Sequence, residues 1–145
     1  MSMRALLDVN VWVALFDDAH QFSDHANAFI ETRGCKIATC PLVENGVIRV
    51  LSLPGYGQRG GLPIQVVRER LRLACSSLDH EFWPDDITLR DDTRVDFGRV
   101  QGHNQITDLY LLALAVRHGG CLATFDQAIA LSSVRGATAR HLKML

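Results

Sequence analysis

The stretch RALLDVNVW, residues 4–12, decides the fold class of this chain. Its apolar run stops at Asp8, and a short run of this kind is typical of a strand buried in a parallel sheet. Helical spacing of apolar residues follows at once, over residues 10–16. A strand joined directly to a helix is the building unit of an α/β fold.

The same alternation continues along the chain. The helix expected over TDLYLLALAVRH, residues 107–118, is apolar on nearly all sides and should therefore be buried. Alternating strands and helices predict a short parallel sheet with helices on both faces, which is a three-layer α/β fold. The remaining strands are expected at 36–39, 80–84, 121–125 and 138–142, and the remaining helices at 21–33, 41–51, 64–78 and within 91–100.

Length and composition exclude several classes of protein. With 145 residues, 48% of them hydrophobic, the chain is expected to be a single domain over 1–145. No apolar run approaches the roughly 18 residues of a membrane span, and the N-terminus lacks the apolar core of a secretory signal. The four cysteines form no C-x-x-C pair, which favours reduced thiols and a cytoplasmic location. A net charge of -1 gives no overall attraction for nucleic acid.

Three aspartates lie at the ends of the expected elements. Asp8 ends the first strand, Asp126 ends the strand at 121–125, and Asp108 lies in the first turn of the buried helix. Because open parallel sheets bind ligands beyond the carboxyl ends of their strands, Asp8 and Asp126 should converge. Glu44, within the apolar segment LVENGVI, is a fourth candidate that points either at the core or at this crevice.

Several carboxylates in one crevice require a cation, because like charges raise each other's pKa. Mg²⁺ and Mn²⁺ prefer oxygen ligands, and such an ion can activate water for the hydrolysis of a phosphodiester. Each acid taken alone also has a structural explanation. Asp8 and Asp126 are suited to helix caps, Asp108 to the helix dipole, and Glu44 to a pair with an arginine. The set as a whole indicates a metal-dependent hydrolase.

Four motifs, in this order and spacing, resemble those of PIN-domain proteins, and in particular the VapC-type toxin ribonucleases of bacterial toxin–antitoxin pairs. They are LLDVNVW at 6–12, TCPLVENGVIRVL at 39–51, ITDLYLLALA at 106–115 and LATFD at 122–126. The resemblance extends from residue 4 to about residue 142 and implies a Mg²⁺- or Mn²⁺-dependent endoribonuclease. It implies that the catalytic, metal-binding acids are Asp8, Asp108, Asp126 and, directly or through water, Glu44.

The resemblance further implies supporting residues and partners. Asn10, Thr107 and Thr124 match supporting polar positions, and Thr124 shares a strand face with Asp126. The implied partners are a cognate antitoxin, a second copy of the chain in a homodimer, and an RNA substrate, for which transfer or ribosomal RNA is our guess. Three aromatic residues are expected either to line the antitoxin surface or to fill the core: Trp12, Phe16 and Phe22.

Other patterns suggest competing functions. The loop PGYGQRG contains G-x-G-x-x-G at Gly55, Gly57 and Gly60, which is typical of dinucleotide-binding domains. Pro54 before the first glycine and the delayed start of the next helix argue against that function and favour a flexible loop. The six histidines show no metal-ligand spacing. The arginines of residues 68–72 fit either an RNA-binding surface or an ordinary exposed helix face.

One alternative from a different class remains open. A PIN-like binding module without catalysis would keep this fold and act through its protein partner. The complete set of four acids argues against it. Phosphatase and receiver folds of similar topology are excluded because Asn10 stands where a phosphatase needs an acid, and the two lysines are badly placed for a receiver.

Overall fold

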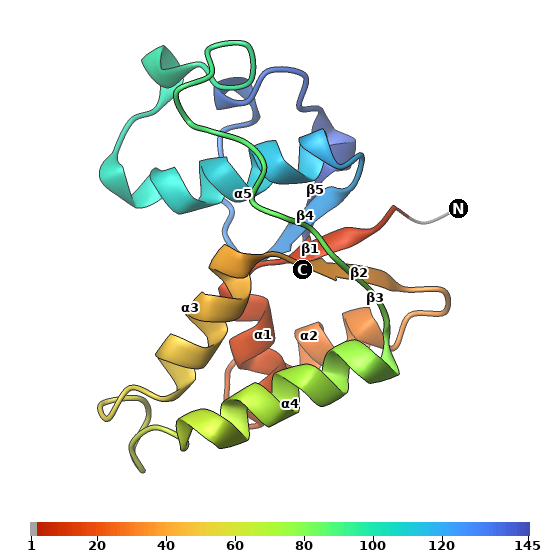
Figure 1. Ribbon diagram of the computed structural model, residues 1–145, viewed down its shortest axis with the longest axis vertical. Helices are drawn as coiled ribbons and strands as arrows, with labels where there is room; N and C mark the ends of the chain where they lie inside the picture. The colour runs from red at the N-terminus through yellow and green to blue at the C-terminus, as the bar shows by residue number, and fades with distance from the viewer. Residues whose placement is uncertain (1–2) are drawn as a thin grey trace.

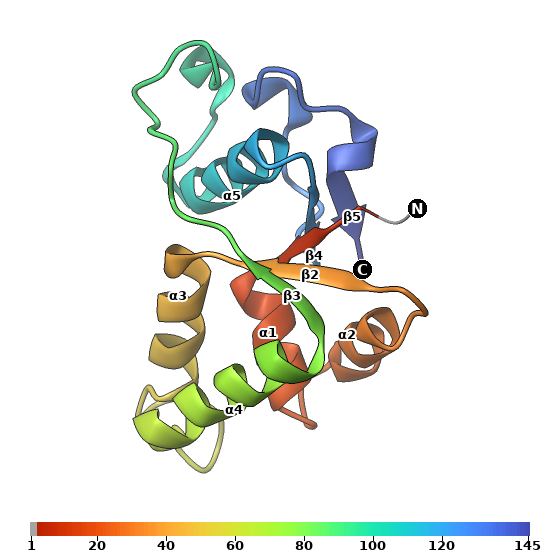
Figure 2. The same ribbon diagram turned by 45° about the vertical axis from the view of Figure 1, so that its right-hand side comes forward.

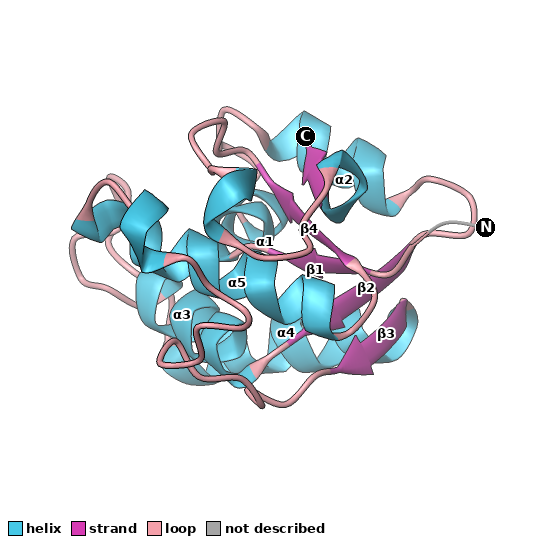
Figure 3. Cartoon of the chain, turned by 90° about the horizontal axis from the view of Figure 1, so that it is seen from above, coloured by secondary structure: helices cyan, strands magenta, loops and turns pink. Residues whose placement is uncertain are grey.

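A computed structural model describes residues 3–145, which form a five-stranded sheet between two layers of helices (Figure 1). The strand order is β3-β2-β1-β4-β5, and every pairing between neighbouring strands is parallel. The strands fan out when seen from above, as a twisted sheet does (Figure 3). The expected three-layer α/β fold is confirmed. The strands are β1 (Ala5–Leu7), β2 (Lys36–Thr39), β3 (Asp79–Phe82), β4 (Cys121–Thr124) and β5 (Leu142–Met144).

The helices divide unequally between the two faces of the sheet (Figures 1 and 2). Four of them lie on one side: α1 (Val9–Phe16), α2 (Ser23–Ile30), α3 (Pro41–Leu51) and α4 (Ile64–Ser77). On the other side lies α5 (Ile106–Arg117). The chain therefore leaves β1 on one face of the sheet and enters β4 from the other. This reversal opens a crevice at the carboxyl ends of β1 and β4, where α/β proteins bind their ligands.

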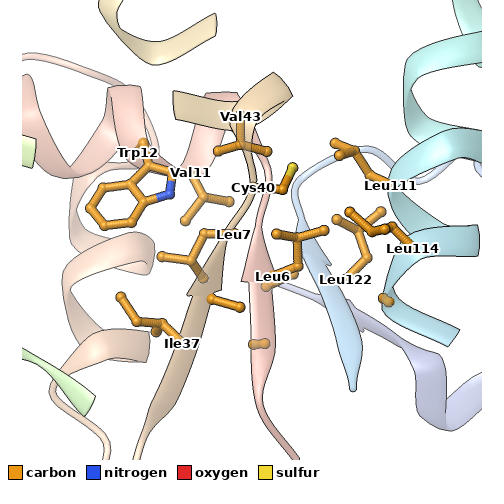
Figure 4. Packing of buried hydrophobic residues seen from close by; sticks show 14 of the residues in the cluster. Leu6, Leu7, Val11, Trp12, Ile37, Cys40, Val43, Leu111, Leu114 and Leu122 are labelled. Carbon is orange, nitrogen blue, oxygen red and sulfur yellow. The ribbon is translucent and has the colours of Figure 1, made fainter. Parts of the chain in front are cut away.

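The central strand β1 is buried on both faces, which explains its continuous apolar sequence (Figure 4). Successive side chains of a strand point to opposite faces. Leu7 lies toward Trp12 on the α1 side, whereas Leu6 lies toward Leu111 and Leu114 on the α5 side. All of these side chains are buried. The direction of β1, and so the position of Asp8 at its end, is fixed by packing on both sides.

The edges of the fold differ most from the sequence predictions. Residues 91–100 contain only a 3-10 turn, Phe97–Arg99, in place of a helix. The expected strand at 138–142 begins with a 3-10 turn, Ala139–His141, and β5 follows it. This turn is stabilised by a capping box, in which Thr138 and the His141 side chain bond each other's backbone amides. The strand is therefore delayed to Leu142.

The glycine-rich segment is a loop between α3 and α4, as predicted. The apolar stretch VIRVLSL before it belongs to the end of α3 and the turn that follows, and α4 begins only at Ile64. Gly57 and Gly60 have φ angles of 64° and 79°, which a residue with a side chain rarely adopts. The loop is tied to the end of α1 by a hydrogen bond of 2.6 Å from Tyr56 Oη to Asp17 Oδ2. It lacks the strand-to-helix connection of a dinucleotide site.

Two further observations concern the whole described chain. Within residues 3–145, no helix combines the length and apolar character needed to cross a membrane. All four cysteines are free thiols, as the sequence predicts.

Candidate active site

Asp8 caps the amino end of α1 directly after β1. Its Oδ1 accepts a hydrogen bond of 2.7 Å from the Val9 amide, and its Oδ2 accepts one of 2.9 Å from Thr124 Oγ1. Only 6% of the residue is exposed, and this burial raises the pKa of the carboxyl group. Asp8 is thus both the predicted helix cap and a buried acid held in one orientation.

The Thr124 hydroxyl joins the ends of two strands. Besides donating to Asp8, it accepts a hydrogen bond of 3.0 Å from the backbone amide of Asp126. Leu7 pairs with Ala123 in the sheet, so the residues that follow each of them stand side by side. Thr124 itself is fully buried. One hydroxyl therefore fixes the spacing between the two acids that end β1 and β4.

The protonation of Asp108 and that of Asp126 depend on each other. Burial, a hydrogen bond with Asp126 and the negative charges of Asp8 and Asp126 raise the pKa of Asp108 to about 7. The same hydrogen bond, together with the Ala128 amide 2.8 Å from Asp126 Oδ1, lowers the pKa of Asp126. Three acids therefore lie close enough to perturb one another, as the positions of their elements predict.

These acids open onto a hollow of about 300 Å³. Asn10 and Thr107, both expected as supporting residues, line it as well. One wall comes from a single face of α3: Leu42, Gly46, Arg49 and Val50. Arg49 was missed by sequence reasoning, although its separation of seven residues from Leu42 and three from Gly46 places it on the same helix face.

Glu44 does not join the other three acids. Its Oε2 accepts a hydrogen bond of 2.7 Å from Thr39 Oγ1, and the same hydroxyl lies 2.7 Å from His80 Nε2. Glu44 faces a different hollow, bounded by side chains of α4 that include Arg68 and Arg72. The metal-binding role of Glu44 stays a prediction, since three of the four acids line the same hollow and the partner of Glu44 is a threonine and not an arginine. The reason is rotational, because Glu44 lies two residues from Leu42 and Gly46 and so points to another side of α3.

The donor set of the hollow suits a hard divalent cation. Within residues 3–145, no group of three or more His, Cys, Asp or Glu side chains is already arranged to hold a metal ion. The hollow nevertheless offers carboxylate, amide and hydroxyl oxygens with no sulfur or imidazole, which favours Mg²⁺ or Mn²⁺ over Zn²⁺. Burial contributes most to the raised pKa of Asp108, and the negative charges of Asp8 and Asp126 add a repulsion that a cation would relieve. The residues present fit such an ion.

Comparisons with known proteins identify the family of this chain. The family model described as "PIN domain" matches residues 5–134. This chain belongs to the PIN domain family. The PIN domain is 44% identical to Ribonuclease VapC44 of Mycobacterium tuberculosis over 99% of this chain and 100% of that protein. It is 39% identical to Ribonuclease VapC39 of the same organism, over 92% of this chain and 96% of that protein.

A solved structure shows the same fold at greater distance. It is the crystal structure of VapBC2 from Rickettsia felis bound to a DNA fragment from the promoter. One of its chains matches this PIN domain with a TM-score of 0.55 and 18% sequence identity, over 87% of this chain and 90% of that one. The layered fold is therefore common to the two proteins.

The aromatic residues near α1 differ in their exposure. Trp12 is fully buried, so the expectation that it lines a partner surface is wrong and the core explanation holds. Phe16 and Phe22 are half-buried. The Phe22 ring stacks on that of Phe125, with 4.6 Å between ring centroids, directly beside Asp126 in the sequence.

Proposed function

We propose that this PIN domain protein is a metal-dependent endoribonuclease and the toxin of a type II toxin–antitoxin pair. The observation that carries the proposal is the meeting of Asp8, Asp108 and Asp126 in one hollow at the carboxyl ends of β1 and β4. Relatives named Ribonuclease VapC, at 39–44% identity over nearly the whole chain, support RNA as the substrate. The alternative, a binding module without catalysis, gives no reason for a buried cluster of acids.

The protein's own groups prepare the site in three ways. Val9 and Thr124 hold the Asp8 carboxylate in one orientation, which avoids the cost of ordering it during the reaction. The raised pKa of Asp108 favours a proton on its carboxyl group, and a cation held by Asp108 and Asp126 would displace that proton. Asn10 and Thr107 offer polar groups at the wall of the hollow. When bound, Mg²⁺ or Mn²⁺ would supply Lewis acidity for the attack of water on a phosphodiester.

Partners and location belong to the same proposal. A cognate antitoxin would inhibit the nuclease, and the similarity to relatives named VapC supports such a partner. We propose a homodimer that acts in the cytoplasm on transfer or ribosomal RNA. Size-exclusion chromatography with light scattering tests the dimer independently of catalysis.

The decisive experiment is cleavage of total bacterial RNA by the purified protein, beside an Asp108→Asn variant and an Asp92→Asn control. Asp92 is exposed, outside the hollow, and its substitution removes the same charge. We expect cleavage that requires Mg²⁺ or Mn²⁺ and stops on chelation. Cleavage should fall by more than about 100-fold in Asp108→Asn and not in Asp92→Asn, because only the Asp108 substitution removes a proposed metal ligand. Restoration by Zn²⁺ alone would contradict an oxygen-only site.

Two other results would contradict the proposal. A folded wild-type protein that binds Mn²⁺ in calorimetry but cleaves no RNA would establish the binding module as the better description. Cleavage that survives in Asp108→Asn would show that the three-acid hollow is not the active site.

A further inference from the structure

Arg49 is the positively charged residue in the wall of the acid hollow. Among the described residues that line this hollow, no other carries a positive charge, whereas Asp8, Asp108 and Asp126 are all acidic. Arg49 lies in the last turn of α3 and is exposed to solvent. It therefore stands where a ligand entering the hollow would pass.

The guanidinium group of Arg49 has no protein partner in the part of the chain that the structure describes. Five other arginines there form ion pairs with carboxylates, namely Arg4, Arg72, Arg94, Arg99 and Arg117. Arg49 forms neither an ion pair nor a side-chain hydrogen bond, although three acids share its hollow; only its backbone oxygen accepts a bond, from Ser52. All five of its N–H donors remain available to a ligand.

A purely structural role explains Arg49 only in part. A cation near the carboxyl end of a helix interacts favourably with the helix dipole, but this interaction needs only the charge and does not depend on the face. Arg49 lies on the face of α3 that turns toward Asp8. Gly46 lets that face approach α1 closely, since a Cβ atom there would be 2.8 Å from Val9 Cγ2. The packing of α3 thus brings Arg49 to the hollow.

We propose that Arg49 binds a phosphate group of the RNA strand beside the three acids, through bidentate hydrogen bonds from the α3 side. This inference rests on the proposed ribonuclease function. A cluster of carboxylates repels a polyanion, so cations at the rim must hold the strand. The planar guanidinium fork matches two phosphate oxygens, and such charged hydrogen bonds are about twice as strong as neutral ones.

The test is RNA binding without cleavage. Fluorescence anisotropy measures the binding of a short fluorescein-labelled single-stranded RNA to the Asp108→Asn protein. The same titration is repeated after Arg49→Ala or Arg49→Lys is added to the Asp108→Asn protein. Arg33→Ala is the matched control, because Arg33 is exposed, forms no ion pair in the described chain, and precedes β2 at the opposite end of the sheet. Thermal unfolding of each variant confirms that it is folded.

We expect Arg49→Ala to weaken binding by about 10-fold, as the loss of a charged hydrogen bond does. The slope of log K against log salt concentration should become shallower by roughly 0.7, the value for one contact to a single-stranded phosphate. Arg49→Lys should restore the slope but only part of the affinity, because the charge remains and the fork is lost. Arg33→Ala should change neither.

Three outcomes would overturn the inference, and they are distinguishable. Unchanged affinity and slope in both Arg49 variants, with RNA still bound, would overturn this inference and leave the ribonuclease proposal intact. No RNA binding by any variant or by wild type would overturn both. Equal losses in Arg49→Ala and Arg33→Ala would show non-specific attraction to charge and would also overturn it.

Discussion

The hydroxyl group of Thr124 carries two hydrogen bonds that hold the acid site together, one to Asp8 Oδ2 and one from the Asp126 amide. Thr124→Val preserves the shape of the side chain and removes both bonds. Because a buried carboxylate oxygen then lacks its donor, we expect the free energy of unfolding to fall by about 1–3 kcal/mol. We also expect Mn²⁺ affinity to fall 10- to 100-fold, roughly the cost of losing a group that orients a metal ligand.

Urea unfolding and calorimetric Mn²⁺ titration measure these two effects of the Thr124 substitution separately. Thr124→Ser, which keeps the hydroxyl, is the matched control and should retain most of the metal affinity. Loss of stability without loss of affinity would show that Thr124 supports the sheet and does not orient Asp8.

Single residues at the site could be predicted where the backbone alone places them. Asp8 and Asp126 stand just after the ends of strands, so the order of strands and helices was enough to predict that they converge, and Asp108 stands in the first turn of α5. Thr124 was implied by the resemblance to PIN-domain proteins, and the two-residue period of a strand placed it on the same face as Asp126. Sequence reasoning missed Arg49 and left the direction of Glu44 open, because both lie within a helix, where direction depends on how the helix is rotated against its neighbours.

At the scale of elements, α3 presents two functional faces. Val43 and Val47 are fully buried and fix its rotation, which turns Arg49 to the acid hollow and Glu44 to Thr39 and α4. The directions of Arg49 and Glu44 cannot be read from the sequence, since they depend on how α3 packs in the folded protein. The start of the edge strand β5 was predicted wrongly for a related reason. None of its residues is buried, and a local capping box delays its start.

The two faces of α3 lead to a prediction for Glu44→Gln. Glutamine can still accept the hydrogen bond from Thr39, and the residue lies outside the acid hollow. We therefore expect RNA cleavage to fall far less than in Asp108→Asn, with Mn²⁺ affinity within a few-fold of wild type. Single-turnover cleavage and calorimetry compare the two variants. An equal loss in both would mean that Glu44 turns into the metal site during the reaction, as the family resemblance implies.

At the scale of the whole molecule, the site joins parts that fold onto opposite faces of the sheet. Asp8 follows β1, Asp126 follows β4, and Asp108 begins α5, so charge repulsion among them acts against the closed assembly of the layers. The pKa of Asp108 is about 7 in the folded protein and near 3.8 when unfolded. Between these pH values the folded chain holds a proton that the unfolded chain has released. The contribution of Asp108 to stability therefore falls as pH rises through this window.

A bound cation should reverse this loss. We expect the melting temperature of chelator-treated protein to fall between pH 5 and pH 7.5, and Mn²⁺ to raise it again at pH 7.5. At about 100 times its dissociation constant, a ligand that binds only the folded state adds about 2.7 kcal/mol. In Asp108→Asn, which holds no titrating proton at this position, both the pH dependence and the Mn²⁺ effect should shrink. Circular dichroism melts of wild type and Asp108→Asn under these conditions measure both effects, and a wild-type melting temperature indifferent to Mn²⁺ would contradict a metal site that spans the layers.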